Sequence, residues 1–272
     1  MEISSRTIPL SETSMSYHVS QPNSAGTPIV LLHPWFGCWQ FWKSVMTSFP
    51  DRPCYAVDFY SPATGDWSTV ASPTDLADTV ISMLDSENLD QVDLIGNSVG
   101  GIVAQIIAAI APERIRRLIL VGTGANTTGA LPGFAAAVDR WTKIARSGDV
   151  PSHDTVEDTV RMLVTSRPDN ATWDSYIQAV RETDPTYITA VLLAARELDL
   201  TPQLHRISAP TLIIRGSEDC ARTAEHSAAL AAGIPTARSI EIAGAGHSPM
   251  VDHPAEFLRL VVDHLDAVIP TS

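Results

Sequence analysis

Lysine, cysteine and long apolar runs are all scarce in this chain of 272 residues. No apolar run reaches the length of about 20 residues that crosses a bilayer, so the sequence predicts no membrane-spanning helix. The three cysteines, Cys38, Cys54 and Cys220, have neither a paired nor a metal-ligand spacing. We therefore expect reduced thiols rather than a disulfide framework or a metal site.

Basic residues are also few, since 18 lysines and arginines stand against 31 aspartates and glutamates and give a net charge of −13. A surface of that sign repels polyanions, which argues against nucleic acid or an anionic membrane as a partner. Residues 1–6 lack the basic and then apolar stretch of a secretory signal. We therefore expect a cytoplasmic protein whose partner is a small molecule, and we leave open whether it forms a homodimer.

Short apolar runs alternate with helical patterns over much of the chain. These runs cover residues 28–33, 54–59, 92–95, 117–121 and 210–215, and a further strand is expected at 237–242. Strands that are apolar throughout are typical of a parallel sheet buried on both faces. The sequence therefore predicts an α/β fold, with a mostly parallel sheet and helices on both faces, and two short strands within residues 1–20.

The alternation stops after Gly129. From about residue 131 to 204 the sequence shows only helical patterns, over 134–145, 155–164, 170–181 and 186–198. We expect a helical cap of residues 130–206, inserted into a core that consists of residues 1–129 and 207–272.

The segment Gly96-Asn97-Ser98-Val99-Gly100 joins a buried strand to a buried helix. A G-x-S-x-G sequence in this context is typical of a tight turn that exposes the serine hydroxyl at the carboxyl edge of a sheet. A side chain at position 96 or 100 would crowd such a turn. For the pentapeptide alone, a glycine-rich turn with a surface serine is the alternative interpretation.

A serine hydroxyl becomes a useful nucleophile only when a base takes its proton and a third group holds that base. Of the eight histidines, His247 is the best placed, because it lies in the glycine-rich loop after the last strand. The loop at 122–129 carries no carboxylate, whereas the loop at 215–219 carries Glu218 and Asp219. By elimination, the second loop supplies the acid.

Four segments together resemble the motifs of an α/β-hydrolase-fold protein of the small, cap-bearing type. His33-Pro34-Trp35-Phe36-Gly37 resembles the oxyanion stretch, and residues 96–100 resemble the nucleophile elbow. Gly216-Ser217-Glu218-Asp219 resembles the acid loop, and Gly246-His247-Ser248-Pro249 the histidine loop. The order serine, aspartate, histidine is that of the fold.

The resemblance implies a role for each matching residue. Ser98 would be the nucleophile, His247 the general base and then acid, and Asp219 the acid that orients the imidazole. The backbone N–H groups of Val99 and Trp35 would stabilise the oxyanion, and neither a cofactor nor a metal is implied. His33 and Asp58 match positions that are usually structural.

Two departures from the family pattern affect the site. Pro34 stands where a glycine is common and can donate no N–H, and the N–H of Phe36 is the alternative second oxyanion donor. Residues 58–65 also lack the usual D-x-x-G-x-G-x-S spacing, so that loop is expected to take another shape.

Ser98 argues against the dehalogenases and epoxide hydrolases of this fold, which carry an aspartate at the elbow. It favours hydrolysis of an ester, thioester or lactone through an acyl-enzyme. Phe36, Trp39 and Trp141 are the candidate substrate-binding residues, and they favour a small apolar or aromatic molecule. The alternative is that aromatic residues here are core, which we favour for Trp42 and Trp173.

Other functions stay open. The sequence G-N-S-x-G-G around Asn97 resembles the elbow of C–C bond hydrolases that cut ring-cleavage diketones. Cofactor-free oxygenases and small-molecule receptors also share the fold, and a receptor would bind tightly with little turnover. A nucleotide-binding loop at 122–124 is disfavoured, because Thr127 stands where a third glycine would fall.

Overall fold

The computed structural model describes residues 2–9, 14–59, 72–127 and 131–267. Within these ranges the strands form one eight-stranded sheet in the order β1-β2-β4-β3-β5-β6-β7-β8. The strands are β1 (Ile3–Pro9), β2 (Ser14–Ser20), β3 (Ile29–Leu32), β4 (Cys54–Asp58), β5 (Val92–Asn97), β6 (Ile115–Val121), β7 (Thr211–Gly216) and β8 (Ala237–Ile242). Only the pairs β1 with β2 and β2 with β4 are antiparallel among the described strands. The predicted fold class is therefore confirmed.

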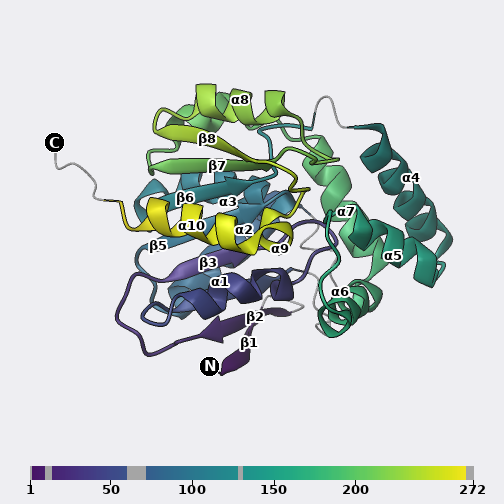
Figure 1. The fold of residues 1–272 in the computed structure, drawn as a ribbon, viewed down its shortest axis with the longest axis horizontal. Helices are drawn as coiled ribbons and strands as arrows, with labels where there is room; N and C mark the ends of the chain where they lie inside the picture. Colours follow the sequence, from purple (N-terminus) through teal and green to yellow (C-terminus); the bar gives the residue numbers. More distant parts are fainter. Residues whose placement is uncertain (1, 10–13, 60–71, 128–130, 268–272) are drawn as a thin grey trace.

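Helices cover both faces of the sheet (Figure 1). They are α1 (Lys43–Ser48), α2 (Pro73–Ser86), α3 (Val99–Ile110), α8 (Ala224–Gly233), α9 (Pro249–Asp252) and α10 (Pro254–Leu265). Along β3, Val30 and Leu32 join one apolar cluster, with α2, α3 and α8, while Ile29 and Leu31 join another, with α1 and α10. Each central strand is thus buried on both sides, which explains why its sequence is apolar rather than alternating.

Four α-helices lie between β6 and β7 in the described part of the chain, and Figure 1 shows them together at one side of the sheet. They are α4 (Pro132–Ser147), α5 (His153–Arg161), α6 (Asn170–Glu182) and α7 (Pro185–Arg196). Each matches a helical pattern read from the sequence, although α5 begins and ends two to three residues earlier than its pattern. We call them the inserted helices.

The inserted helices contact the core through helix packing and through loops at the strand ends. α7 packs on α2, α3 and α4, and Ile188 of α7 accepts a hydrogen bond from the indole N–H of Trp35, after β3. On the other side, Asp252 accepts hydrogen bonds from the N–H groups of Thr165 and Ser166 and, with its second oxygen, from that of Gly246. The inserted helices are therefore anchored to the carboxyl ends of the strands, where the candidate site residues lie.

Candidate active site

Ser98 is held in a strained turn between β5 and α3. Its φ is +55° and its ψ is −115°, a combination that residues with a side chain rarely adopt. The turn is fixed by two hydrogen bonds with β6 and the loop that follows it: Ser98 N–H donates to Val121 O at 2.9 Å, and Thr123 Oγ1 donates to Ser98 O at 2.8 Å. Such strain persists where the surroundings enforce it, and it is common at functional sites.

The two glycines of the elbow are required by space, as the sequence predicted. A Cβ on Gly96 would lie 2.3 Å from the carbonyl oxygen of Gly100, and a Cβ on Gly100 would lie 2.3 Å from that of Leu32. Gly101 is equally confined, because its Cβ would lie 2.7 Å from Cβ of Thr123. The elbow therefore packs backbone against backbone.

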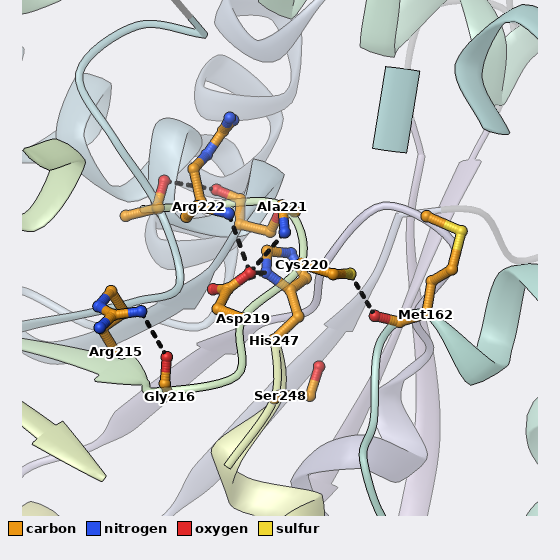
Figure 2. A network of polar contacts seen from close by, with 12 residues as sticks. Met162, Arg215, Gly216, Asp219, Cys220, Ala221, Arg222, His247 and Ser248 are labelled. Atoms are coloured by element: carbon orange, nitrogen blue, oxygen red, sulfur yellow. Dashed lines mark hydrogen bonds and ion pairs between the residues drawn. The ribbon is translucent and has the colours of Figure 1, made fainter. Parts of the chain in front are cut away.

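Asp219 and His247 form a buried hydrogen-bonded pair (Figure 2). Nδ1 of His247 donates to the Asp219 carboxylate, at 2.9 Å from Oδ1 and 3.0 Å from Oδ2. Because a carboxylate only accepts, Nδ1 carries the proton, and Nε2 of the neutral ring is left as the basic nitrogen. Glu218, the other carboxylate of the loop, is exposed, so the structure separates the two candidates that the sequence left open.

The loop after β7 wraps around the Asp219 carboxylate. The backbone N–H groups of Ala221 and Arg222 donate to Oδ1, at 2.8 and 2.9 Å. Burial by itself would raise the pKa of Asp219, but the charge of His247 and the hydrogen bonds from His247, Ala221 and Arg222 outweigh it and hold this pKa below its usual value. Asp219 is thus kept ionised and able to stabilise a protonated imidazole.

Asn97 ties the elbow to the histidine loop. Its Nδ2 donates to the carbonyl oxygens of Val121 and His247, both at 3.0 Å, and its Oδ1 accepts from Ser248 Oγ at 3.1 Å. In the sequence, Asn97 stands out only by a family resemblance, which does not predict this role. An amide at the end of a buried strand must find both donors and acceptors nearby, and that requirement could have indicated it.

Gly122 lies where the elbow, the acid and the histidine loop meet, and it too was missed. Its φ is +50°, and a Cβ there would lie 2.8 Å from His247 O, 3.0 Å from Asp219 Oδ2 and 3.2 Å from Asn97 Nδ2. The structure therefore brings three segments that are distant in sequence together around one glycine. Gly122 serves the packing of this site, not a phosphate-binding turn: residues 122–127 form no helix, and α4 begins only at Pro132.

The predicted oxyanion stretch is a tight turn after β3. Nε2 of His33 accepts the N–H of Phe59 at 2.9 Å, so its Nδ1 carries the proton and donates to Pro34 O at 2.8 Å. The N–H of Gly37 donates to the same oxygen at 2.8 Å. His33 thus has the structural role that the sequence suggested. Most of the unusual loop at 58–65 lies outside the described residues.

The two predicted oxyanion donors start from favourable positions. Val99 is the first residue of α3, and the first N–H groups of a helix have no acceptor within it. Trp35 precedes Phe36, whose φ is +58°, so the backbone bends sharply at this point of the turn. The roles of both N–H groups stay predictions.

Phe36 and Trp141 meet at the junction between the core and the inserted helices. Their ring centroids are 4.1 Å apart, and Trp35 lies between Phe36, at 4.1 Å, and Phe134 of α4, at 5.6 Å. The indole N–H of Trp141 donates to Thr159 Oγ1 at 2.9 Å. These four aromatic side chains are buried, and their contact with a substrate stays a prediction.

Trp39 lies in different surroundings. Its ring stacks on His18, with centroids 4.2 Å apart, and it lines two clefts of about 640 and 280 Å³. Neither Ser98 nor His247 is among the described residues that line these clefts. Trp42 and Trp173, which the sequence favoured as core, are buried, so that prediction is confirmed.

No group of three or more His, Cys, Asp or Glu side chains in the described part of the chain could hold a metal ion. None of the described helices combines the length and the apolar character needed to span a bilayer.

All three cysteines are free thiols, as their spacing predicted. Cys220 donates to Met162 O at 3.0 Å, and burial raises the pKa of its thiol to about 11.

Known proteins with a similar sequence or fold include several hydrolases. The family model described as "Alpha/beta hydrolase family" matches residues 29–260. The chain is 27% identical over 248 residues to a pimeloyl-(acyl-carrier protein) methyl ester esterase of Neisseria meningitidis, covering 88% of this chain and 94% of that protein. It is also 27% identical over 262 residues to a 2-hydroxymuconate semialdehyde hydrolase of a Pseudomonas species, covering 89% and 88%.

Solved structures share the fold. An esterase from a Rhodococcus species superposes with a TM-score of 0.83 at 24% identity, covering 99% of this chain and 100% of that one. An enol-lactonase from Burkholderia xenovorans superposes with a TM-score of 0.82 at 21% identity, covering 94% and 97%. At these identities the likeness shows the common architecture.

Proposed function

This chain belongs to the alpha/beta hydrolase family, and from that premise we propose that it is a serine hydrolase of an ester or a lactone. The proposal rests above all on the buried hydrogen bond between His247 and Asp219, which lies beside the strained elbow of Ser98 around Gly122. A carboxylate, a neutral imidazole and a sharply turned serine are the three groups that acyl transfer needs.

The proposed reaction has two steps. Ser98 Oγ attacks the carbonyl carbon while Nε2 of His247 takes the hydroxyl proton. The tetrahedral oxyanion accepts hydrogen bonds from the N–H groups of Val99 and Trp35, each of which lowers the barrier by roughly 2.7–4 kcal/mol. The intermediate collapses, and the alcohol leaves with the proton held by His247. Water then attacks the acyl-enzyme with the same base, and the acid is released.

Asp219 supports both steps from behind the imidazole. Its carboxylate stays ionised and hydrogen-bonded to Nδ1, so the ring cannot rotate away and its protonated form is stabilised. In our proposal the inserted helices, residues 130–206, act as a cap over this site. Phe36 and Trp141 would then face a small apolar or aromatic part of the substrate.

Hydrolysis of a carbon–carbon bond is the second candidate. Asn97 beside Ser98 favours it, because this residue resembles the elbow of hydrolases that cut ring-cleavage diketones. The likeness to a 2-hydroxymuconate semialdehyde hydrolase points the same way. A vinylogous diketone substrate, assayed beside an ester of similar size, would separate the two candidates by their relative kcat/KM.

The test is the pre-steady-state hydrolysis of an activated aryl ester. We expect a burst in the wild type, no burst in Ser98→Ala, and a fall in kcat of about 10⁴-fold in Asp219→Asn, since the amide favours the wrong tautomer of the histidine. Ser82→Ala, on the exposed side of α2, is the matched serine control and should keep the burst. Tight ligand binding without any turnover would replace the hydrolase proposal by a receptor.

A further inference from the structure

Arg222 is a buried cation without a protein partner for much of its side chain. The residue is 3% exposed, and among the residues that the structure describes neither Nε nor Nη1 has a hydrogen-bond partner. A guanidinium carries five N–H donors and keeps its charge when buried. Burying such a charge without a compensating anion strongly destabilises a protein, so this residue needs an explanation.

One other buried arginine, Arg117, and two half-buried ones, Arg52 and Arg116, show how this chain holds such side chains. Arg117 is also 3% exposed, but it donates to the carbonyl oxygen of Ala267. Arg52 and Arg116 both pair with the carboxylate of Asp93. Arg222 differs from all three, although it lies in a loop that carries two carboxylates.

Asp219 does not serve as the hydrogen-bond partner of the Arg222 side chain. The Asp219 carboxylate already accepts from Nδ1 of His247 and from the backbone N–H groups of Ala221 and Arg222. Figure 2 shows the Arg222 side chain extending away from this carboxylate. Burial lowers the pKa of Arg222 and the charge of Asp219 raises it, so the two groups interact through space only.

We propose that Arg222 binds a carboxylate on the substrate, at a distance from the bond that is cleaved. The proposal rests on the proposed function for the reaction itself and adds the substrate class: a half-ester of a dicarboxylic acid, or a lactone that bears a carboxylate. The planar fork of a guanidinium matches the two oxygens of a carboxylate. Arg222 is three residues from the acid that orients His247, and its guanidinium points away from that acid. A substrate whose carboxylate binds Arg222 while its carbonyl reacts with Ser98 must therefore have several bonds between these two groups.

The local charges favour a monoanion. Arg222 is the one cation in the stretch from Ser217 to Thr223, which also holds Glu218 and Asp219. A dianion such as a phosphate monoester would add a second negative charge beside Asp219 with no second cation from this stretch to offset it. With a net charge of −13, the protein repels anions at long range, so binding a carboxylate requires a dedicated cation of this kind.

A pair of matched esters tests the proposal. 4-Nitrophenyl hydrogen adipate and 4-nitrophenyl hexanoate differ in whether a carboxylate or a methyl group ends the same acyl chain. We expect the wild type to favour the adipate ester in kcat/KM, and Arg222→Met to lower that value by about 10- to 100-fold, the range of one charged hydrogen-bonded pair. The same variant should keep the hexanoate value within about twofold. An equal loss on both esters, or no loss on either, would overturn the assignment.

A folded-state control separates binding from structure. Arg222→Met removes a buried charge without a protein partner, so its melting temperature should not fall. Arg117→Met removes an equally buried arginine that does have a partner, and should lower the melting temperature while leaving the preference for the adipate ester unchanged. A destabilised Arg222→Met that is slow on both esters would mean that Arg222 supports the acid loop instead.

Ligand binding to the inactive variant Ser98→Ala tests the carboxylate site separately from the proposed hydrolysis. In Ser98→Ala, monomethyl adipate should raise the melting temperature more than methyl hexanoate does, and the double variant with Arg222→Met should lose this difference. If the wild type cleaves neither aryl ester but this difference is present, the hydrolase proposal fails and the carboxylate site stands. If Ser98→Ala shows no preference for monomethyl adipate, the carboxylate site is wrong, whatever the enzyme hydrolyses.

Discussion

The two ends of the parallel strands both bury a carboxylate, but they compensate it in different ways. At the amino ends, Asp93 of β5 is fully buried and accepts hydrogen bonds from Arg52 and Arg116. At the carboxyl ends, Asp219 is almost as buried, and its side-chain partner is the imidazole of His247. The two sites differ in the partner rather than in the depth of burial.

That difference separates a buried ion cluster from the proposed catalytic pair. An arginine keeps its proton at any ordinary pH, so the partners of Asp93 do not serve as bases. In the proposed mechanism the imidazole of His247 takes a proton from Ser98 and returns it to the leaving group. Among the described serines, the one with a positive φ, Ser98 at +55°, lies at the carboxyl ends. Four substitutions test this comparison.

The largest effect is expected for Gly122→Ala. The added Cβ would contact His247 O at 2.8 Å and Asp219 Oδ2 at 3.0 Å, at a φ of +50°. We expect kcat/KM to fall by about 100-fold or more, because small displacements of catalytic groups have effects of that size. Gly133→Ala in α4, whose Cβ would meet nothing within 4 Å, is the control and should stabilise the protein by about 0.5–1 kcal/mol. Full activity in Gly122→Ala would show that the three segments do not need this close approach.

Asp93→Asn should affect stability and leave the chemistry unchanged. It leaves Arg52 and Arg116 without their shared anion, which we expect to lower the free energy of unfolding by about 3 kcal/mol. Denaturant unfolding measures the loss, and kcat on an activated ester at a temperature where the variant is folded should equal that of the wild type. A tenfold change in kcat would show that the cluster around Asp93 also affects the chemistry at the carboxyl ends.

Asn97→Ala should have a moderate effect at the carboxyl ends. It removes hydrogen bonds to Val121 O, His247 O and Ser248 Oγ, so the histidine loop loses its tie to the elbow. We expect a fall in kcat of about tenfold and a loss of about 2 kcal/mol in stability, since buried groups lose their partners. Asn170→Ala, an exposed amide on α6, should change neither quantity. An unchanged kcat in Asn97→Ala would limit its role to stability.

The smallest effect is a pH dependence at the amino ends. Burial lowers the pKa of His264 to about 4, and its Nε2 donates to Pro210 O at 3.1 Å. The folded protein therefore holds this ring neutral, while the unfolded chain protonates it below about pH 6.5. Stability should be fully present above pH 6.5 and decrease as the pH falls towards 4. His264→Gln should flatten the melting temperature over that window, and an identical slope in both proteins would assign the acid sensitivity to other groups.

Several features of the site followed from short stretches of sequence. The glycines at 96 and 100 were required by a turn that the pattern of strand, serine and helix already implied, and their close contacts confirm it. The four inserted helices were also predicted, with small errors at the ends. Helical spacing of apolar residues indicates that a helix exists better than it indicates where the helix ends.

Other features depend on segments that are distant in sequence. The bonds of Asn97 to His247 and Ser248 join residues about 150 positions apart. The confinement of Gly122 involves three different loops, and nothing in the neighbourhood of Arg222 in the sequence distinguishes it from Arg117. Trp39 has the same residue type as Trp35 and lies four positions later, yet it stacks on His18 rather than joining Phe36 and Trp141.

The sequence by itself determined the parallel sheet, the elbow at Ser98 and the candidates for base and acid, because apolar patterning, glycine spacing and loop chemistry are properties of neighbouring residues. Only the tertiary structure decided which carboxylate hydrogen-bonds to His247, how Asn97 and Gly122 join the loops, and that Nε and Nη1 of the buried Arg222 have no hydrogen-bond partner among the described residues. These outcomes depend on which strand ends lie side by side. Burial makes these neighbours decisive, because a polar or charged group removed from water costs free energy unless the fold places a partner next to it.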